Sequence, residues 1–451
     1  MGLITNWLHK SFSHGIHPPQ WKDQTRAHAI RRLPFAPQLI LPLSQHIGKP
    51  AIPLVSKGQE VIRGEPIARA DGWLSSPLHA PATGVISDIT LMPTAKGPKA
   101  EAIILRPYAG SSQEVLYETP RDVTGMSAKD VVQAIQQCGM VGLGGAAFPT
   151  HVKFLPPEDA CIDTLVVNGC ECEPFLTTDH RIMLEYTDAL LSGIRITLAA
   201  TGASQAVIGI EDNKLDAVAA IRSRLLANDN IRVEVVQTKY PQGAEKILIK
   251  TLLNREVPSG GQSYMIGVVT SNVGTLAELG MLLPQGHGLV ERVVTVTGPG
   301  INKPGNYVVP LGTPMAFLLD YAGFDGSARE VILGGPMMGG AVASLDVPVT
   351  KGVSGILVLN ETGIASETRR VYACIKCARC VDACPMNLNP SMLGQLATKR
   401  EYETMEQRYH LNDCFECGCC SYVCPSNIPL TQYFRIAKAI NLETRLREQA
   451  A

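Results

Sequence analysis

The chain has 451 residues, of which 45% are apolar, enough to fill the cores of about three domains. Its formal net charge is -1, so it lacks the basic surface that broad nucleic-acid binding requires, and we expect no nucleic-acid partner. We find neither a run of about 18 uncharged apolar residues nor a signal-peptide pattern, which favours a cytoplasmic protein that meets a membrane only through partners.

Residues 1–30 form an N-terminal segment whose first part has helical periodicity. Its apolar residues fall on one face of a helix; they are Leu3, Ile4, Trp7, Leu8 and Phe12. We expect a helix that packs on this protein's own core. A docking helix for a partner or a membrane surface is the alternative.

Residues 31–115 consist of short strand-like runs separated by glycine and proline. The runs from Val55 to Ala68 and from His79 to Ile86 resemble those of biotinyl- and lipoyl-type sandwich domains. Such domains carry their cofactor on a lysine at a hairpin tip, but the corresponding turn here, Asp71-Gly72-Trp73-Leu74, has no lysine. We therefore expect a structural sandwich module.

Helical and strand patterns alternate across residues 120–290. This alternation predicts an α/β domain with a mainly parallel sheet. Strands are expected at Thr164–Val167, Ala206–Ile210, Arg232–Gln237 and Ile266–Thr270. Helices are expected at Ala128–Gln137, His180–Ala200 and Leu215–Leu226.

Two smaller regions follow the α/β domain. Residues 291–345 return to strands and turns, which predicts a small sheet domain with a short helix. Residues 365–451 hold most of the cysteines, with helical stretches expected at Ser391–Gln407 and Leu430–Arg447.

The cysteines carry the most specific pattern, because nine of the 13 lie between Cys374 and Cys424. They form two runs of Cys-x2-Cys-x2-Cys-x3-Cys-Pro, which is typical of bacterial ferredoxins with two [4Fe-4S] clusters. In such pairs the fourth cysteine of each run ligates the other cluster. The predicted sets are Cys374, Cys377, Cys380 and Cys424 for one cluster, and Cys414, Cys417, Cys420 and Cys384 for the other.

Zinc is the alternative ligand of such cysteines, but zinc would not require two full four-cysteine runs, each closed by proline. Cys419 is surplus to the pattern. It competes with Cys420, which the spacing favours.

A glycine-rich segment, residues 139–148, follows the first expected helix of the α/β domain. Its small residues let backbone N–H groups approach an anion, and Lys153 follows where it can meet a phosphate. No strand directly precedes the segment, so it lacks the usual dinucleotide fingerprint, and a structural turn is the alternative.

Polar residues follow three of the expected strands, at the edge where α/β domains bind ligands. Asn168 to Pro174 includes Glu171 and Glu173, whose carboxylates can accept hydrogen bonds from a ribose or a flavin ring. A solvated acidic turn is the alternative for this segment. Residues 240–246 and 271–275 follow the other two strands.

The order of these motifs resembles the NADH- and FMN-binding flavoprotein subunit of respiratory complex I. Over nearly the whole chain it resembles the RnfC family of the Rnf (Rsx) electron-transport complex. The shared motifs are Gly15–Pro19, the sandwich module, Val141–Lys153, Asn168–Pro174, Gly334–Gly339 and the double cysteine run. The resemblance implies a multidomain α/β and β protein. Its parts are an N-terminal barrel-sandwich module, an α/β flavin- and NADH-binding domain, a small β-grasp (SLBB-like) domain and a C-terminal helical two-[4Fe-4S] ferredoxin-like domain.

The resemblance also implies cofactor-binding residues. Those implied to contact FMN are Gly142, Gly144, Lys153, Asn168, Glu171, Tyr240, Gly243 and Asn272. Those implied to shape the nicotinamide nucleotide side are Gly145, Phe148, Glu173 and Glu245. The sequence departs from the complex I pattern at Leu143, Cys170, Ala244 and Ser271, which bears on the strength of flavin binding more than on its place.

The implied function is that of an NADH-linked oxidoreductase subunit in an ion-translocating complex. Electrons would pass between NADH and ferredoxin through FMN and the two clusters, and membrane subunits would move the ion. The protein would lie peripherally on the cytoplasmic side of the bacterial inner membrane and contact RnfB, the cluster-bearing iron–sulfur subunit. We expect no side-chain acid, base or nucleophile, because hydride moves directly to flavin. The alternatives are a corrin (cobalamin) reductase, a family that lacks the leading sandwich module, and a cluster-only electron relay.

Overall fold

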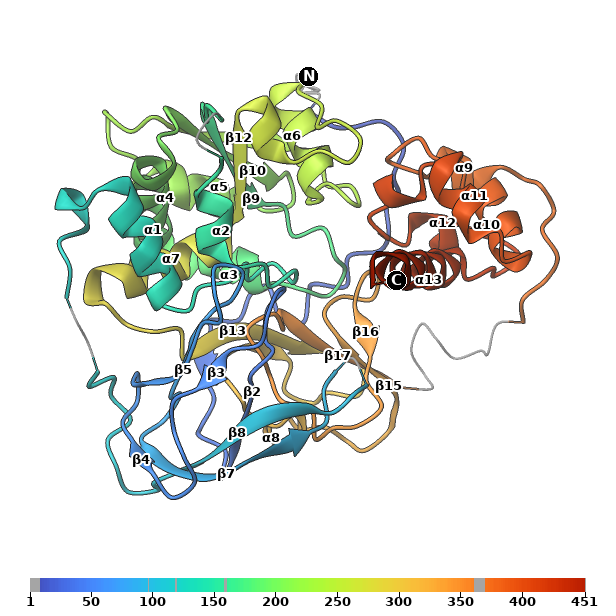
Figure 1. Ribbon diagram of the computed structural model, residues 1–451. Helices are drawn as coiled ribbons and strands as arrows, with labels where there is room; N and C mark the ends of the chain where they lie inside the picture. The colour runs from blue at the N-terminus through green and yellow to red at the C-terminus, as the bar shows by residue number, and fades with distance from the viewer. Residues whose placement is uncertain (1–8, 96, 118–119, 158–159, 361–369, 451) are drawn as a thin grey trace, which may run out of the picture.

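The structure is a computed structural model that describes residues 9–95, 97–117, 120–157, 160–360 and 370–450 (Figure 1). The helix expected around Leu3, Ile4, Trp7 and Leu8 lies outside the described residues. Phe12 is described and lies outside any helix. In the described part of the chain, none of the helices combines the length and apolar character needed to cross a membrane.

Two antiparallel sheets form the sandwich module. In spatial order, the first consists of β2 (Leu39–Pro42), β8 (Ala100–Pro107), β7 (Gly84–Met92) and β4 (Glu60–Val61). The second consists of β3 (Ile52–Pro53), β5 (Pro66–Arg69) and β6 (Leu78–His79). Ile67, Ile86 and Leu105 are fully buried in the core of this module, because apolar residues of short strands can be covered only by a facing sheet.

The α/β domain is built on a four-stranded, all-parallel sheet. Its spatial order is β11 (Ile231–Val236), β10 (Gln205–Glu211), β9 (Thr164–Gly169) and β12 (Val268–Asn272). The expected strands at these positions are confirmed. Its helices are α1 (Ala128–Gln137), α2 (Thr150–Phe154), α3 (Thr178–Glu185), α4 (Thr187–Thr201), α5 (Leu215–Arg222), α6 (Glu245–Leu253) and α7 (Val273–Gln285). A 3-10 turn spans Val123–Gly125 before α1, and another spans Ser263–Ile266 before β12.

The single helix expected at His180–Ala200 is two helices, because the backbone of Tyr186 leaves the helical conformation between α3 and α4. Helix α4 then packs against α7 at very short range. A Cβ atom added to Gly193 would lie 1.8 Å from the carbonyl oxygen of Leu276, and one added to Gly280 would lie 2.0 Å from that of Ala189. Glycine is therefore required on both sides of this helix contact.

A six-stranded mixed sheet forms the β-grasp domain. In spatial order its strands are β1 (Arg31–Arg32), β14 (Gly305–Pro310), β13 (Glu291–Thr297), β17 (Gly355–Asn360), β15 (Ala328–Leu333) and β16 (Gly340–Ala341). Helix α8 (Met315–Tyr321) covers its core.

The predicted boundaries of this domain, 291–345, need correction at both ends. Strand β17 extends the sheet to Asn360 by pairing in parallel with β13. Strand β1, which we assigned to the sandwich module at 31–115, pairs in parallel with Tyr307 and Val308 of β14. Pairings between such distant segments leave no local pattern, so the sequence could not reveal them.

The C-terminal domain is helical. Its helices are α9 (Arg379–Asp382), α10 (Pro390–Thr398), α11 (Tyr402–Gln407), α12 (Cys419–Tyr422) and α13 (Leu430–Ala450), with a 3-10 turn at Leu411–Asp413. The one helix expected at Ser391–Gln407 is two, because the chain turns at Arg400, which has a φ of 60°. Leu393, Met405 and Phe434 form its small core.

Figure 1 shows how these parts are arranged. The α/β domain lies above the two β domains, and the helical C-terminal domain lies at their side. The N-terminal segment passes from the α/β domain toward the C-terminal domain before the chain enters the β domains.

Candidate functional site

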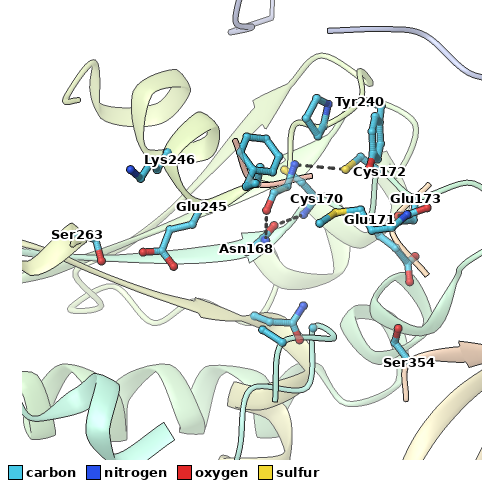
Figure 2. A pocket seen from close by; sticks show the side chains of 18 of the residues that line it. Asn168, Cys170, Glu171, Cys172, Glu173, Tyr240, Glu245, Lys246, Ser263 and Ser354 are labelled. Carbon is cyan, nitrogen blue, oxygen red and sulfur yellow. Dashed lines mark hydrogen bonds between the residues drawn. The ribbon is translucent and has the colours of Figure 1, made fainter. Parts of the chain in front are cut away.

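A cavity of about 650 Å³ opens where β9 and β12 end, and a second cavity of about 200 Å³ adjoins it. The larger volume falls in the range of small-molecule sites. The residues that line both cavities are Gly144, Ala146, Asn168, Gly243, Glu245 and Asn272. In Figure 2, Asn168 lies between Glu245 with Ser263 at one end and Tyr240 with Cys172 at the other.

The structure brings almost all predicted nucleotide-binding residues to these two cavities. Those that line only the smaller cavity are Gly142, Phe148 and Lys153. Those that line only the larger one are Glu171, Glu173 and Tyr240. Those that line both are Gly144, Asn168, Gly243, Glu245 and Asn272. Gly145 lines neither; it is exposed in the same loop, with a φ of 106°.

The glycine-rich loop folds back on itself. The amide of Gly142 donates to the carbonyl oxygen of Phe148 at 2.8 Å, and that of Leu143 donates to Oγ1 of Thr275 at 2.9 Å. A Cβ atom at Gly243 would lie 2.4 Å from the carbonyl oxygen of Cys170. One at Gly144 would lie 3.3 Å from Cβ of Asn272. Side chains are thus absent where backbone segments approach most closely, which suits a cradle for a phosphate.

Lys153 supplies a cation to the smaller cavity. Its Nζ lies 2.7 Å from Oε2 of Glu245 and 2.5 Å from Oγ1 of Thr270. Burial raises the pKa of Glu245, but the charge and hydrogen bond of Lys153 outweigh this effect, so the pKa is lowered overall. The carboxylate of Glu245 is therefore ionised at neutral pH, and the side chain of Lys153 can turn to a phosphate when one is bound.

The carboxylates of Glu171 and Glu173 have partners within the protein. Glu171 accepts hydrogen bonds from the amides of Asp179 at 2.9 Å and His180 at 3.4 Å, at the N-terminus of α3. Glu173 accepts from the amides of Met337 at 3.1 Å and Met338 at 2.8 Å, which belong to the β-grasp domain. Burial raises the pKa of Glu173 to about 7. Both carboxylates thus organise the cavity wall, and their implied ligand roles remain predictions.

Two residues with clear structural roles at the site were missed from the sequence. Asp179 lines the larger cavity, where its Oδ2 accepts from Nδ2 of Asn272 at 2.7 Å. Burial and then the charge of Glu171 raise its pKa to about 7. Its only sequence signal is an acidic residue in the first turn of a helix, which is too common to indicate a site.

Lys22 is the second missed residue. It is buried, and its Nζ donates to the carbonyl oxygens of Glu171 at 2.8 Å, Glu173 at 2.9 Å and Leu176. It therefore holds the loop that carries both glutamates. A lysine about 150 residues upstream of that loop gives no sequence signal for this role.

The cysteines of the C-terminal domain gather in the two predicted sets. Cys374, Cys377, Cys380 and Cys424 line one cavity of about 260 Å³. Cys384, Cys414, Cys417 and Cys420 line another, together with Cys419. The structure thus brings each fourth cysteine to the opposite run. Eight thiols in two groups of four provide the donors that two [4Fe-4S] clusters need.

Among the described residues, no three His, Cys, Asp or Glu side chains converge as a single metal ion would require. A four-iron cluster takes one thiolate at each iron. Its four cysteines surround a volume, whereas the ligands of one zinc ion converge on a point.

The set with Cys384, Cys414, Cys417 and Cys420 lies beside the large cavity. The hydroxyl of Tyr240, a cavity residue, donates to the carbonyl oxygen of Cys417 at 2.7 Å. Asn412, Asp413 and Phe415 also line the cavity. We call Cys384, Cys414, Cys417 and Cys420 the near set. Cys374 and Cys377 of the other group, the far set, are exposed.

Comparison with known families agrees with this division of the chain. Residues 10–108 match the RnfC barrel sandwich hybrid domain, and residues 135–280 match the Nuo51 FMN-binding domain. Residues 293–340 match the SLBB domain, and residues 373–428 match a 4Fe-4S dicluster domain. The expected fold class and its cofactors, FMN and two [4Fe-4S] clusters, are thereby confirmed.

Three relatives have similar sequences over nearly the whole chain. The C component of the proton-translocating ferredoxin:NAD(+) oxidoreductase complex of Clostridium ljungdahlii is 40% identical over 98% of this chain and 96% of its own length. The C component of the ion-translocating oxidoreductase complex of Haemophilus influenzae is 41% identical over 95% of this chain. That of Salmonella gallinarum is 40% identical over 98%. The chain spans 64% and 65% of the length of these last two relatives.

Proposed function

The chain belongs to the RnfC family, the C components of ion-translocating oxidoreductase complexes, and we propose that it carries electrons between NAD(H) and an iron–sulfur partner. When bound, FMN exchanges hydride with the nicotinamide and single electrons with the clusters. The protein's own task is to hold the nucleotides in the cavity, to exclude water between the cavity and the cysteines, and to expose one cluster to a partner.

One contact carries the proposal: the hydrogen bond from Tyr240 to the carbonyl oxygen of Cys417. Tyr240 is almost fully buried and packs with Ile16, Ala383 and Cys419. Buried Tyr240 therefore lies between the large cavity and the near set. We propose the order cavity, near set, far set, partner.

The surroundings of the far set support its place at the end of this route. Val371, Tyr372 and Ile375 line the same cavity as the far set and expose 52%, 56% and 67% of their surface. Arg379 and Lys376 add positive charge in the same stretch. Such an exposed apolar patch with a charged rim suits a protein docking surface.

Within the cavities, we propose that the glycine-rich loop and Lys153 bind the FMN phosphate. Asn168, Asn272 and Tyr240 would face the flavin. Phe148 and Glu245 would border the nicotinamide nucleotide. No side-chain acid, base or nucleophile is needed in this arrangement.

We further propose partners and a location for the chain from the functions of its relatives and from the family resemblance. The partners are the other members of an Rnf complex, above all the cluster-bearing RnfB, with ferredoxin reached through the complex. The membrane subunits translocate the ion. The chain is peripheral on the cytoplasmic side of the bacterial inner membrane.

An anaerobic NADH titration of the purified protein, followed by absorbance and by electron paramagnetic resonance, tests the proposal. Flavin extraction should give FMN, and iron should approach about eight per chain. NADH should reduce the flavin and then the clusters. Tightly bound FMN that NADH fails to reduce would contradict the proposed activity.

Two matched cysteine variants test the proposed order. Cys374→Ala should leave reduction of the near cluster by NADH intact. Cys414→Ala should stop reduction of the far cluster while leaving reduction of the flavin unchanged. If the far cluster of Cys414→Ala is still reduced at the wild-type rate, the order is wrong.

A further inference from the structure

The N-terminal strap, residues 9–22, runs along the segment that leads from β11 into the large cavity. The carbonyl oxygen of Lys10 accepts from the amide of Gln237 at 3.0 Å. Ile16 and Tyr240 exchange both of their backbone hydrogen bonds, each at 2.9 Å. The strap thus fixes the backbone of the residue that separates the cavity from the near set.

The same strap also binds the cluster domain. Nδ1 of His14 donates to the carbonyl oxygen of Asp382 at 2.8 Å, and the amide of Gly15 donates to that of Ala383 at 3.2 Å. Asp382 and Ala383 directly precede Cys384, the near-set cysteine that comes from the other run. Adjacent residues of the strap therefore bind the cavity residue Tyr240 on one side and the segment before Cys384 on the other.

Gly15 stands at the point where these segments meet. Its φ is 74°, and a Cβ atom there would lie 2.7 Å from both the carbonyl oxygen of Tyr240 and the ring of Phe12. Both the conformation and the lack of space require glycine. The next residue, Ile16, is buried against Tyr240, Ala383 and Cys419.

The far end of the strap holds a second wall of the cavity. Lys22 donates to three carbonyl oxygens of residues 171–176, as described above. Trp21 also stacks on Phe175 of that loop, with ring centroids 6.0 Å apart. The strap therefore contacts the cavity at Tyr240 and at the loop of residues 171–176. Between these contacts it binds the cluster domain.

We infer that the strap is a positioning element that sets the separation between the flavin cavity and the near cysteine set. The rate of electron transfer falls steeply with distance. A strap that fixes the separation between the flavin cavity and the near set therefore controls the rate of electron transfer between flavin and cluster. The inference rests on the proposed function. It assigns His14, Gly15 and Ile16 a role in the transfer step and none in nucleotide binding or in ligation of iron.

Gly15→Ala in the full chain, loaded with FMN and clusters, tests this inference. Gly202→Ala is the matched control, because Gly202 has a nearly equal φ of 72° but nothing within 4 Å of an added Cβ atom. Stopped-flow absorbance under anaerobic conditions separates reduction of the flavin by NADH from reduction of the clusters. Photochemical reduction of the flavin, without NADH, starts the second step independently.

We expect Gly15→Ala to keep its FMN, its iron and its rate of flavin reduction. Cluster reduction should slow severalfold, since the rate of electron transfer falls steeply as the donor and the acceptor move apart. Hydrogen exchange should accelerate at Ile16, Tyr240 and residues 379–384. Gly202→Ala should behave as wild type in all of these measurements.

A milder pair of variants decides the matter if Gly15→Ala fails to fold or loses iron. His14→Ala removes the hydrogen bond to Asp382, and His14→Asn restores a donor at the same distance from the backbone. We expect slower cluster reduction in His14→Ala and recovery in His14→Asn. Cluster reduction at the wild-type rate in His14→Ala, despite faster hydrogen exchange, would overturn the inference.

The outcomes also separate this inference from the proposed function. If NADH fails to reduce the flavin of the wild-type protein, the proposed function fails. Photochemical reduction would still compare the strap variants with wild type. If the photochemical experiment shows equal cluster reduction in both, the strap inference fails alone.

Discussion

The cluster domain and the flavin cavity differ in how far apart along the chain their parts lie. All eight candidate cluster ligands fall between Cys374 and Cys424, and each set takes three cysteines from one tight loop. The walls of the large cavity run from Leu143 to Phe415 and include residues of three domains. The local spacing of the cysteines specifies a cluster site of this kind, whereas the large cavity forms only when distant segments have assembled.

The support behind the glycine-rich loop illustrates this dependence. Arg292 and Lys351 are buried basic residues of the β-grasp domain. Nζ of Lys351 donates to the carbonyl oxygens of Gly139 and Pro77, both at 2.7 Å. Nη2 of Arg292 donates to the carbonyl oxygen of Leu143 at 3.1 Å. One domain thus holds the start and the middle of a loop that belongs to another.

The largest effect should come from removing one cluster ligand. We predict that Cys384→Ala abolishes the cluster of Cys414, Cys417 and Cys420 and leaves the far cluster, so iron falls from about eight to about four per chain. Cys419→Ala is the matched control and should retain about eight. Iron analysis with electron paramagnetic resonance measures both. Selective loss of the far cluster in Cys384→Ala would show that the ligand sets are not crossed.

A distant support of the flavin cavity should have the next largest effect. Lys351→Met leaves the carbonyl oxygens of Gly139 and Pro77 and the hydroxyl of Ser76 without their buried donor. We expect a loss of about 2–4 kcal/mol in the free energy of unfolding and weaker FMN binding, with both clusters kept. Denaturant unfolding and flavin release measure these effects.

The matched control for Lys351→Met is Lys57→Met, because Lys57 is exposed and pairs with Asp88 at the surface. Its effect on unfolding should stay within about 0.5 kcal/mol. Equal losses in the two variants would mean that the β-grasp domain does not support the loop. The contrast between local and distributed sites would then be weaker than the structure indicates.

A single wall residue of the cavity should have a smaller effect. Glu245→Ala should weaken NADH binding about five- to tenfold while FMN stays bound, because one hydrogen bond to a ligand contributes about 1 kcal/mol. Anaerobic titration with NADH and flavin extraction measure the two properties. Glu256→Ala, at an exposed glutamate paired with Lys250, is the control. Loss of flavin from Glu245→Ala would assign Glu245 to the FMN contacts.

The smallest expected effect is on how the stability of the fold depends on pH. Desolvation of the half-buried Asp179 raises its pKa to about 7, so the folded state holds this proton more tightly than the unfolded chain does. Stability should therefore fall as pH rises from the ordinary carboxyl range to about 7 and stay lower above it. Asp179→Asn should remove at least about 1 kcal/mol of this fall. Thermal unfolding between about pH 6 and pH 8 measures it, and an unchanged pH profile would contradict the raised pKa.

Much of the fold could be predicted because its signals are local. The parallel strands β9 to β12 and helix α1 follow from apolar runs and periodicity. The breaks at Tyr186 and Arg400 were missed, because a change of one residue's backbone conformation leaves the helical pattern on either side intact. The strand β17 and the placement of Arg31–Arg32 were missed because their pairing partners lie far away along the chain.

The sequence by itself determined the two cysteine sets, since their spacing dictates which thiols share a loop and proline closes each run. It also determined which residues could approach a phosphate, through small side chains and a following lysine. Only the tertiary structure decided that Lys22 and Lys351 hold the cavity walls, that Asp179 faces the ligand site, and that Tyr240 meets Cys417. These contacts depend on how separately folded domains pack together, and no periodicity or motif records the side chain that a distant segment will meet.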